Sequence, residues 1–217
     1  MYTARRYITC ILPGMAPSRD VPSVHTYHRI LDGTSQATLE KGLRTATVQD
    51  ILKASNVSRR TFYQYFSSKE DALKGLYQSH TERLLGRMVE AADQADGEAR
   101  KVMAALDAFL DFQVEGGELL MQLHAEAIRP ESALLPVREE VIDGIVDIMD
   151  THIISALGGL KLDKMVYRAM LLGIEGMCIH IERQGRFNTE DAAYVRSIAQ
   201  PLMMGVLMNH GRLPKRD

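Results

Sequence analysis

Three helix starts follow one another within residues 47–70, and this spacing constrains the fold more than any other feature of the sequence. Thr47 begins a Thr-x-x-Asp pattern, in which a hydroxyl accepts a backbone N–H and an acid lies in the positive first turn. Ser58 and the pattern Ser67-x-x-Glu70 predict two further helix caps. The segment therefore predicts two very short helices followed by the start of a third.

The turn between the two short helices is predicted to be tight. Asn56 lies there, and asparagine tolerates the left-handed backbone conformation better than most residues. Apolar residues at helical spacing flank the turn, with Val48, Ile51 and Leu52 before it and Val57, Phe62 and Phe66 after it. Arg59 and Arg60 fall in the first turn of the second helix, which is helix-turn-helix geometry. Arginine at that place can reach base edges in the major groove, where its fork matches guanine O6 and N7.

The same stretch resembles the DNA-binding signature of TetR-type transcriptional regulators. The resemblance rests on Val57-Ser58-x-x-Thr61-Phe62-Tyr63-x-Tyr65-Phe66-x-Ser68-Lys69-Glu70-x-x-Leu73 and on Thr47-Val48-x-x-Ile51, and it covers residues 28–77. It implies a sequence-specific DNA-binding regulator. The alternative is an amphipathic helical hairpin whose two arginines are merely solvated, and the neighbouring tyrosines and Lys69 argue against it.

Nine residues are predicted to contact DNA, from their place in the signature and their direction away from the apolar side. We expect bases to be read by Arg59, Arg60 and Thr61, phosphates to be held by Thr47, Tyr63, Tyr65 and Lys69, and Ser58 and Gln64 to complete the surface. Tyr63 and Lys69 match the family motif, whereas Arg59 and Arg60 fill variable positions.

The charge distribution supports a DNA-binding end. The whole chain of 217 residues carries a net charge of −2, which says nothing about nucleic acid. Residues 1–80 hold 11 Lys and Arg against 6 Asp and Glu, whereas residues 81–217 hold 15 against 22. A basic front and an acidic rear are typical of a protein that binds DNA at one end only.

The sequence predicts a cytoplasmic protein with no cofactor. Cys10 and Cys178 share no metal spacing, which indicates a reducing compartment. No apolar run reaches the ~18 residues of a membrane span. No Gly-rich phosphate loop, Gly-x-Ser-x-Gly or His-Glu-x-x-His motif occurs, so we expect no enzyme and no catalytic residue. A metal site formed by His124, Glu126, His152, Cys178 and His180 is a less favoured alternative, because histidines on apolar faces usually belong to the core.

The organisation is predicted to be all-α, with a helix-turn-helix three-helix domain before a larger helical domain for ligand binding and dimerisation. We expect an irregular arm at 1–25, the DNA-binding domain at 26–77, the second domain at 78–210 and a tail at 211–217. Arg5, Arg6 and Arg19 of the arm could follow a minor groove, or the arm could be an unstructured leader. The first helix, 26–41, carries Gly33-Thr34-Ser35-Gln36-Ala37-Thr38 where the family usually has alanine and leucine.

That first helix is predicted to be weak, because glycine costs ~1 kcal/mol in a helix interior. We expect it to pack through Ile30, Leu31, Ala37 and Leu39 and to end at Gly42. A longer helix should run from Lys69 past Met88, and further helices are expected at 98–115, 118–128, 137–157, 162–184 and 188–209. Breaks are predicted at Asp96-Gly97, Gly116-Gly117, Pro130 to Pro136, Gly158-Gly159 and Gly185, and a kink at Pro201.

The segment 162–184 predicts a homodimer. It carries two apolar stripes, and a helix that is apolar on two sides is buried on two sides. One side can cover its own domain, and an identical subunit is the simplest partner for the other. In TetR-type regulators the last two long helices usually form such a dimeric four-helix bundle. The predicted dimer contacts are Tyr167, Leu171, Ile174, Cys178, Ile181, Ile198 and Leu202.

The second domain is predicted to bind a small, mostly apolar effector that releases a repressor from its operator. Ten of the twelve methionines lie from Met88 onward, and methionine adapts to irregular apolar space. Histidines on the apolar stripes of three helices could converge, so the predicted pocket residues are Phe109, His124, Met149, His152, Met177 and His180. Three separately satisfied core histidines are an equal alternative, and control by a protein partner without any ligand is another.

Overall fold

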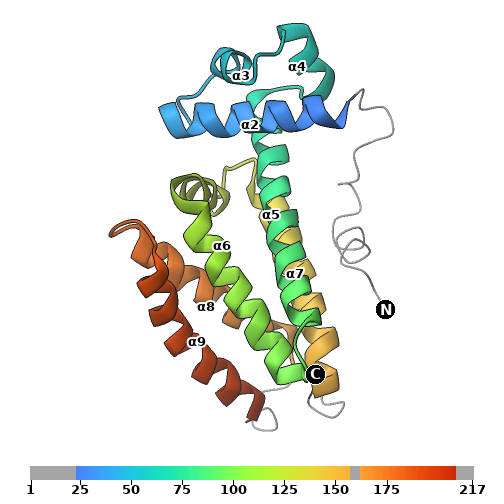
Figure 1. Ribbon diagram of the computed structural model, residues 1–217, viewed down its shortest axis with the longest axis vertical. Coiled ribbons are helices and arrows are strands. Elements are labelled where there is room, and N and C mark those ends of the chain that lie inside the picture. The colour runs from blue at the N-terminus through green and yellow to red at the C-terminus, as the bar shows by residue number, and fades with distance from the viewer. Residues whose placement is uncertain (1–22, 157–161, 209–217) are drawn as a thin grey trace.

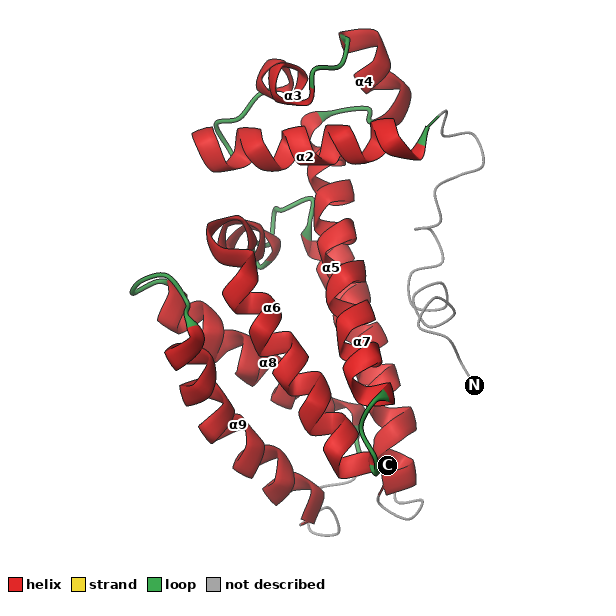
Figure 2. Cartoon of the chain, viewed as in Figure 1, coloured by secondary structure: helices red, strands yellow, loops and turns green. Residues whose placement is uncertain are grey.

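The structure is a computed structural model, and it describes residues 23–156 and 162–208, in which every regular element is an α-helix (Figures 1 and 2). This confirms the all-α prediction. The helices are α2 (Val24–Lys41), α3 (Val48–Ser55), α4 (Arg59–Tyr65), α5 (Lys69–Asp93), α6 (Glu98–Ala127), α7 (Leu135–Ala156), α8 (Lys164–Glu182) and α9 (Thr189–Met208). None of these helices combines the length and the hydropathy that a membrane crossing requires.

The helices form two unequal groups. Figure 1 shows α2, α3 and α4 at one end of the molecule, with α5 leading away from them along α6 and α7, and α8 and α9 on the far side of α6. The predicted arm is outside the described residues except for its last three positions, where α2 has already begun. Gly158-Gly159 and the predicted tail also lie outside the described ranges.

The predicted caps of the short helices are confirmed. Thr47 and Asp50 form a reciprocal capping box, and Ser58 accepts the backbone N–H of Thr61. Asn56 adopts the left-handed conformation at φ 51°. The third cap was assigned one residue too early, because α5 is capped by Ser68, which accepts from the N–H of Asp71.

Glycine in α2 allows a close approach between α2 and α3. A Cβ atom placed on Gly33 would lie 2.5 Å from Cβ of Ser55, far inside van der Waals contact. The adjacent Thr34 and Thr38 are buried, and the Thr34 hydroxyl donates to the carbonyl of Ile30 within the helix. The expectation that Leu39 packs inward is wrong, since it is 44% exposed.

The helix break predicted at Gly116-Gly117 is confirmed at Gly117. Its backbone has φ 52° and ψ −144°, so the segment Glu98–Ala127 is two helices joined at a kink. Glycine reaches this positive φ without the steric cost of a side chain. The next helix starts at Leu135 rather than 137, with Pro136 in its first turn, where proline's missing N–H costs nothing.

One hydrophobic core crosses the predicted domain boundary at residue 77, which falls inside α5. Residues of α2, α3, α4 and the start of α5 share this core with Leu119, Leu123 and Ala127 of the second half of α6, with Leu134 just before α7 and with Val137 at the start of α7. A second core joins the first half of α6 to α8 and α9 through residues such as Phe109, Leu110, Ile174 and Val195. The DNA-binding end is therefore packed against the rest of the chain, chiefly through α2.

The α8 stripe assigned to the dimer faces its own subunit instead. Tyr167, Ile174 and Cys178 are 0%, 8% and 2% exposed, and Leu171 and Ile181 pack against the same cores. Ion pairs orient the helix on α7, with Lys164 on Asp147, Arg168 on both Asp143 and Glu139, and Glu175 on Arg138. The other stripe consequently points outward.

We expect Gly33→Ala to destabilise the protein by ~1–3 kcal/mol, because the new methyl group overpacks the α2–α3 contact. This loss outweighs the gain of about 1 kcal/mol that alanine brings to a helix interior. The urea midpoint measures it. The exposed neighbour Asp32 provides a control, since Asp32→Ala should change stability by no more than ~0.5 kcal/mol. A Gly33→Ala protein as stable as the wild type would contradict the packing argument.

Candidate DNA-binding surface and effector cavity

One side of helix α4 is buried in the shared core, and the opposite side is exposed to solvent. Phe62 and Phe66 are 0% and 4% exposed in the shared core, as predicted. On the opposite side Arg59, Arg60 and Gln64 are exposed, and Tyr63 is 48% exposed. The helix thus presents two guanidinium groups, an amide and a phenol to solvent from a rigidly anchored backbone, which is the arrangement needed to enter a groove of DNA.

Several of the predicted contact residues also have structural partners in this region. Ser58 and Thr61 share a hydroxyl–hydroxyl hydrogen bond of 2.8 Å at the start of α4. The Thr47 hydroxyl donates to Asp50 over 2.6 Å. Hydrogen bonds from Lys41 and then from Thr47 lower the pKa of Asp50 to about 2, so this half-buried carboxylate stays charged at neutral pH. The capping residues therefore present their polar groups at the surface in fixed positions.

Arg59 is oriented by a residue that the sequence analysis did not single out. Its Nη2 donates to Oε1 of Gln49 on α3 over 3.1 Å, and both residues are exposed. Arg60 points into solvent beside it. Gln49 falls on the polar side of α3, but nothing in its spacing indicates a partner ten residues further on.

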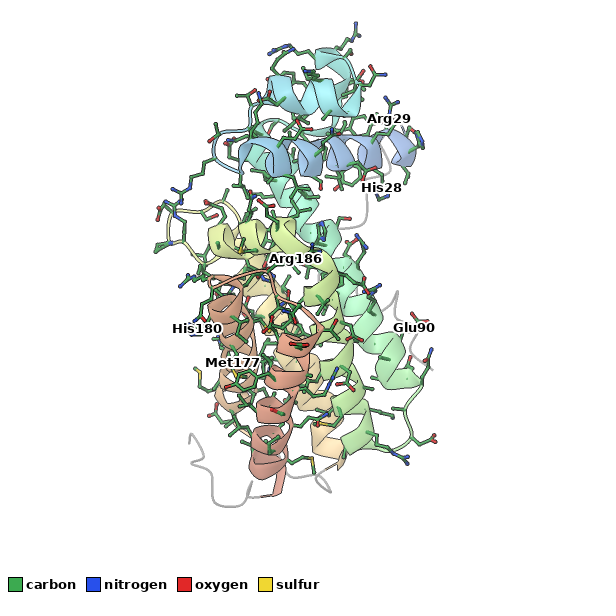
Figure 3. The ribbon with its side chains drawn as sticks, turned by 60° about the vertical axis from the view of Figure 1, so that its left-hand side comes forward. His28, Arg29, Glu90, Met177, His180 and Arg186 are labelled. Carbon is green, nitrogen blue, oxygen red and sulfur yellow. The ribbon has the colours of Figure 1, made fainter. Side chains whose placement is uncertain are left out.

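Arg29 is a second unpredicted residue, and it holds the turn of the helix-turn-helix. It lies on α2 (Figure 3), and its Nη2 donates to the carbonyls of Ser55 and Asn56 over 2.9 and 2.8 Å. These carbonyls belong to the end of α3, where backbone acceptors lack partners within the helix. A cation at a helix C-terminus is also favoured by the helix dipole. Arg29 thus ties α2 to the turn between α3 and α4.

Two of the residues that were predicted to bind phosphates form hydrogen bonds within the protein. The Tyr65 hydroxyl donates to the Ser23 carbonyl over 3.2 Å, at the start of α2. Lys69 Nζ donates to the carbonyls of Arg44 and Leu43 over 3.0 and 3.4 Å, and only 19% of its side chain is exposed. In this structure both side chains tie loops to the helix-turn-helix.

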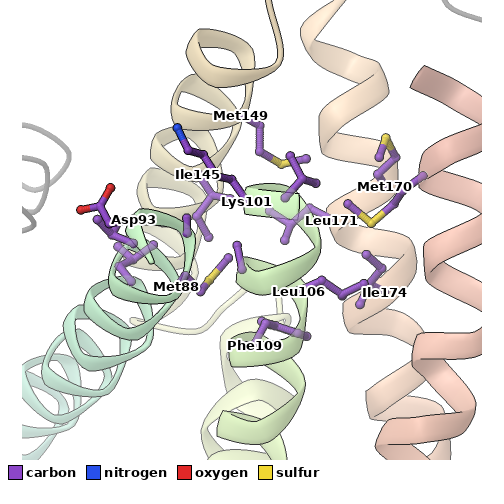
Figure 4. A pocket seen from close by; sticks show the side chains of 16 residues that line it. Met88, Asp93, Lys101, Leu106, Phe109, Ile145, Met149, Met170, Leu171 and Ile174 are labelled. Atoms are coloured by element: carbon purple, nitrogen blue, oxygen red, sulfur yellow. The ribbon is translucent and has the colours of Figure 1, made fainter. Parts of the chain in front are cut away.

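A cavity of about 140 Å³ lies between α5, the first half of α6, α7, α8 and α9 (Figure 4). A cavity needs only ~10–15 Å³ to hold one water molecule, so this cavity is several times larger. The lining is almost entirely aliphatic or aromatic and consists of Leu85, Met88, Val89, Ala92, Val102, Ala105, Leu106, Phe109, Ile145, Met149, Met170, Leu171, Ile174 and Met203, with Asp93 and Lys101 at one end. Such a space suits an apolar ligand.

The predicted pocket residues are only partly brought together. Phe109 and Met149 line the cavity. His180 is exposed on α8 and pairs with Gln184, and Met177 lies on the outer side of the same helix (Figure 3). The side chain of His152 lies outside the described residues. The predicted convergence of histidines is therefore wrong for His180, because the α8 stripe that carries it faces away from the core.

His124 belongs to a buried polar cluster between the cavity and the DNA-binding end. Its ring contacts Tyr77 edge-on, with centroids 6.5 Å apart, and the Arg138–Glu175 ion pair lies nearby. Burial lowers the pKa of His124, so the ring is neutral at neutral pH. This cluster joins α5, α6, α7 and α8, and His124 is buried in it rather than lining the cavity.

The metal alternative finds no support among the residues that the structure describes. No group of three or more His, Cys, Asp or Glu side chains there could hold a metal ion. Glu126 pairs with Arg44 and Arg129, and Cys178 is buried between helices. Burial raises the pKa of the Cys178 thiol to about 12, so the thiol is protonated at neutral pH.

An apolar groove runs along the outer face of α8 and α9. Its volume is about 810 Å³, and its lining includes Met165, Ala169, Gly173, Met177, Leu202 and Val206. Met165 and Leu202 are 60% and 61% exposed. Of the predicted dimer contacts, Leu202 lies here, while Ile198 is half-buried on α9. An exposed apolar area of this kind marks an interaction surface.

The anchored α4, its exposed arginines and the tight turn define a helix-turn-helix DNA-binding protein. Residues 30–75 match the model of bacterial regulatory proteins of the tetR family. This segment of the chain is therefore similar to the DNA-binding part of tetR-type regulators of transcription.

Similar proteins extend this likeness beyond the DNA-binding end. The fatty acid metabolism regulator protein of Bacillus subtilis (strain 168) is 24% identical over 151 residues, which cover 68% of this chain and 78% of that protein. The fatty acid degradation regulator FadR of Bacillus halodurans shares the fold, with a TM-score of 0.69 at 22% identity over 82% of this chain and 96% of that one. FadR of Bacillus subtilis, solved in complex with stearoyl-CoA, has a TM-score of 0.68 at 22% identity, covering 81% and 96%.

Proposed function

We propose that this protein is a homodimeric repressor that binds a pseudo-palindromic operator through α4 and is released by an apolar effector in the cavity. The observation that carries the proposal is that α5 and α6 reach from the cavity to the DNA-binding end. Leu85 and Met88 of α5 line the cavity, and Lys69 at the start of the same helix holds the loop before α3. Control by a protein partner, which is the alternative, would not require such an internal cavity.

An effector with a long hydrocarbon chain is favoured by the lining and by the relatives. Four methionines face the cavity, and their flexible side chains can adapt to a chain of variable shape. The Bacillus subtilis FadR structure holds stearoyl-CoA, whose acyl chain is such a group. We infer that this chain responds to a fatty acid derivative or a similar amphiphile.

Release from DNA would be a population shift. The effector must prefer the conformation in which the two α4 helices are misplaced for the operator. Two helices connect the sites, since α5 is continuous and α6 contributes Phe109 to the cavity and Gln122 to the DNA-binding end. The Gln122 amide oxygen accepts the backbone N–H of Leu43 over 3.2 Å, and Arg44 pairs with Glu126. The α2–α3 loop is thus held by both helices.

Dimerisation is assigned to the outer groove of α8 and α9 rather than to the stripe first predicted. A Cβ atom added to Gly173 or Gly176 meets nothing within 4 Å, so a second copy could approach the backbone closely there. A dimer would place its two α4 helices ~34–36 Å or a multiple apart, on successive major grooves.

We expect Arg60→Ala to cost ~1–3 kcal/mol on the preferred operator and to relax base preference at one position, because Arg60 would read a base. Lys69→Ala should weaken all sequences alike, because it removes both a cation at the DNA-binding end and the hydrogen bonds that hold the loop before α3, and it should reduce the salt slope by about one. Binding to an operator selected from a random pool measures both effects. Arg100→Ala, an exposed arginine on α6, is the control and should leave binding unchanged. Unchanged operator affinity in both variants would refute this assignment.

Gly173→Glu should convert the dimer to a monomer, because it places a charge in the centre of the apolar groove without crowding its own subunit. Sedimentation at micromolar concentration measures the state, and circular dichroism should show unchanged helix content. Ala125→Glu, on an exposed side of α6, should leave the dimer intact. A wild-type chain that is monomeric and still binds a palindrome tightly would contradict the proposal.

An effector that lowers operator affinity 100-fold needs a coupling of ~2.7 kcal/mol, which is within the usual range for allostery. Linkage requires that operator DNA weaken effector binding by the same factor. Titrating a ligand that raises the melting temperature, with and without operator, tests this equality. Equal affinity in the two titrations would show that the ligand is not an inducer, and failure of a broad ligand library to stabilise the protein would favour ligand-independent control.

A further inference from the structure

One hydrogen bond joins the first turns of α3 and α4 at the DNA-binding end. Figure 1 shows both helices on the side of α2 that faces away from the helical body. Arg59 is the first residue of α4, and its Nη2 donates to Oε1 of Gln49, the second residue of α3, over 3.1 Å. Both side chains are exposed, so the pair lies on the surface that would meet DNA.

The two backbones that carry this pair are fixed by the caps of their helices. Gln49 lies inside the Thr47–Asp50 capping box of α3, and Arg59 directly follows Ser58, the N-cap of α4. The hydrogen bond therefore orients a side chain whose starting point is already defined. Among the described residues the adjacent Arg60 has no such partner, so its guanidinium is free to rotate.

The chemistry of the Gln49 amide suits a partner for a base-reading arginine. A guanidinium only donates hydrogen bonds, so the amide must turn its oxygen toward Arg59 and its NH2 group away. A cation in the first turn of a helix opposes the helix dipole, and no acid lies in the first turn of α4. Because Gln49 is neutral, it holds Arg59 in place without neutralising the positive charge that favours DNA.

The contact with Gln49 leaves Arg59 able to read a base. Bidentate recognition of guanine O6 and N7 requires two N–H groups on one edge of the guanidinium. The Nη2 atom carries two hydrogens and contributes one of them to each of the two edges that offer such a pair. Gln49 occupies one of these hydrogens, so one complete edge remains, held in one orientation before DNA arrives.

We propose that Gln49 is a specificity-determining residue that acts through Arg59, and that the oriented arginine reads one guanine of the operator in the major groove. The inference rests on the proposed function, because it assumes an operator. Gln49 is a positioning residue. It reduces the conformational freedom that Arg59 must lose on binding, a loss that weakens association for long, flexible side chains. Arg60 contacts DNA without this help, so the preference that depends on Gln49 is confined to one base position.

The test measures base preference separately from overall affinity in variants of the full chain. An operator is selected from a random pool with the wild type, and each of its positions is then replaced by the other three base pairs. The wild type should prefer guanine at one position by roughly tenfold, and Arg59→Ala should lose this preference. Gln49→Met keeps the helix propensity of glutamine but removes the acceptor, so it should reduce the same preference roughly threefold to tenfold and leave the other positions unchanged.

Two further variants separate the orientation of Arg59 from other roles of the amide. Gln49→Glu keeps the acceptor, so it should retain the guanine preference and weaken all sequences alike, because it adds a negative charge near phosphates. Gln36→Met is the matched control, since Gln36 is an exposed glutamine of α2 that donates to Glu40 of its own helix. It should leave both affinity and preference unchanged.

A double-mutant cycle tests whether Gln49 acts through Arg59. In the Arg59→Ala background, Gln49→Met should change operator affinity by less than about twofold, whereas its effect should multiply with that of Arg60→Ala.

An unchanged guanine preference in Gln49→Met overturns the proposal and leaves the proposed function standing. The same holds for an equal loss of affinity for all sequences in Gln49→Met, as for an amide that only binds a phosphate, and for a Gln49→Glu protein that loses the preference. A wild type that enriches no sequence from the pool overturns both.

Discussion

The shared hydrophobic core is the constraint on which the rest of the structure depends. Short helices such as α3 and α4 are marginal in isolation, and most of their stability comes from tertiary packing. Here Phe62 and Phe66 share a core with Leu119, Leu123 and Val137, so the second half of α6 and the start of α7 help to form the helix-turn-helix. The DNA-binding end and the helical body are therefore joined by one core, in which α2 lies between α6 and the pair α3 and α4 (Figure 1), so a displacement of α6 would reach α4 through α2.

The local parts of the fold could be predicted from the sequence because their causes are local. A capping hydroxyl, an Asn at a left-handed turn and a Gly-Gly break act within four residues, and the structure has each of them at Thr47, Asn56 and Gly117. Gly33 led to the prediction of a weak first helix, because only its local effect can be read from the sequence. Its cost in helix propensity is visible in the sequence, whereas the contact with Ser55 that requires it comes from another helix. The roles of Arg29 and Gln49 also depend on such contacts.

The face of α8 that enters the core could not be chosen from apolar content, because both of its stripes are hydrophobic. The polar strip between the two stripes determines which of them faces the core. This strip forms ion pairs with α7, of Arg168 with Glu139 and of Glu175 with Arg138. These pairs join residues 29 and 37 positions apart, a distance at which spacing gives no register. Once they form, Tyr167 and Cys178 are buried and His180 is excluded from the cavity.

The geometry also indicates how large a change in buried apolar area an effector must cause. Helix α5 has 25 residues and no internal break, so it spans about 37 Å as one rod from Lys69 to the cavity end. In contrast, α6 is interrupted at Gly117 between its cavity half and the half that holds Leu43. A coupling of ~2.7 kcal/mol corresponds to about 110 Å² of apolar area buried in one conformation and not in the other, at ~25 cal/mol per Å². That is less than the area of one buried aromatic side chain (~150–250 Å²). A ligand therefore needs to change the burial of no more than one or two cavity residues, such as Met88 or Phe109, provided that the shared core carries their displacement to α4.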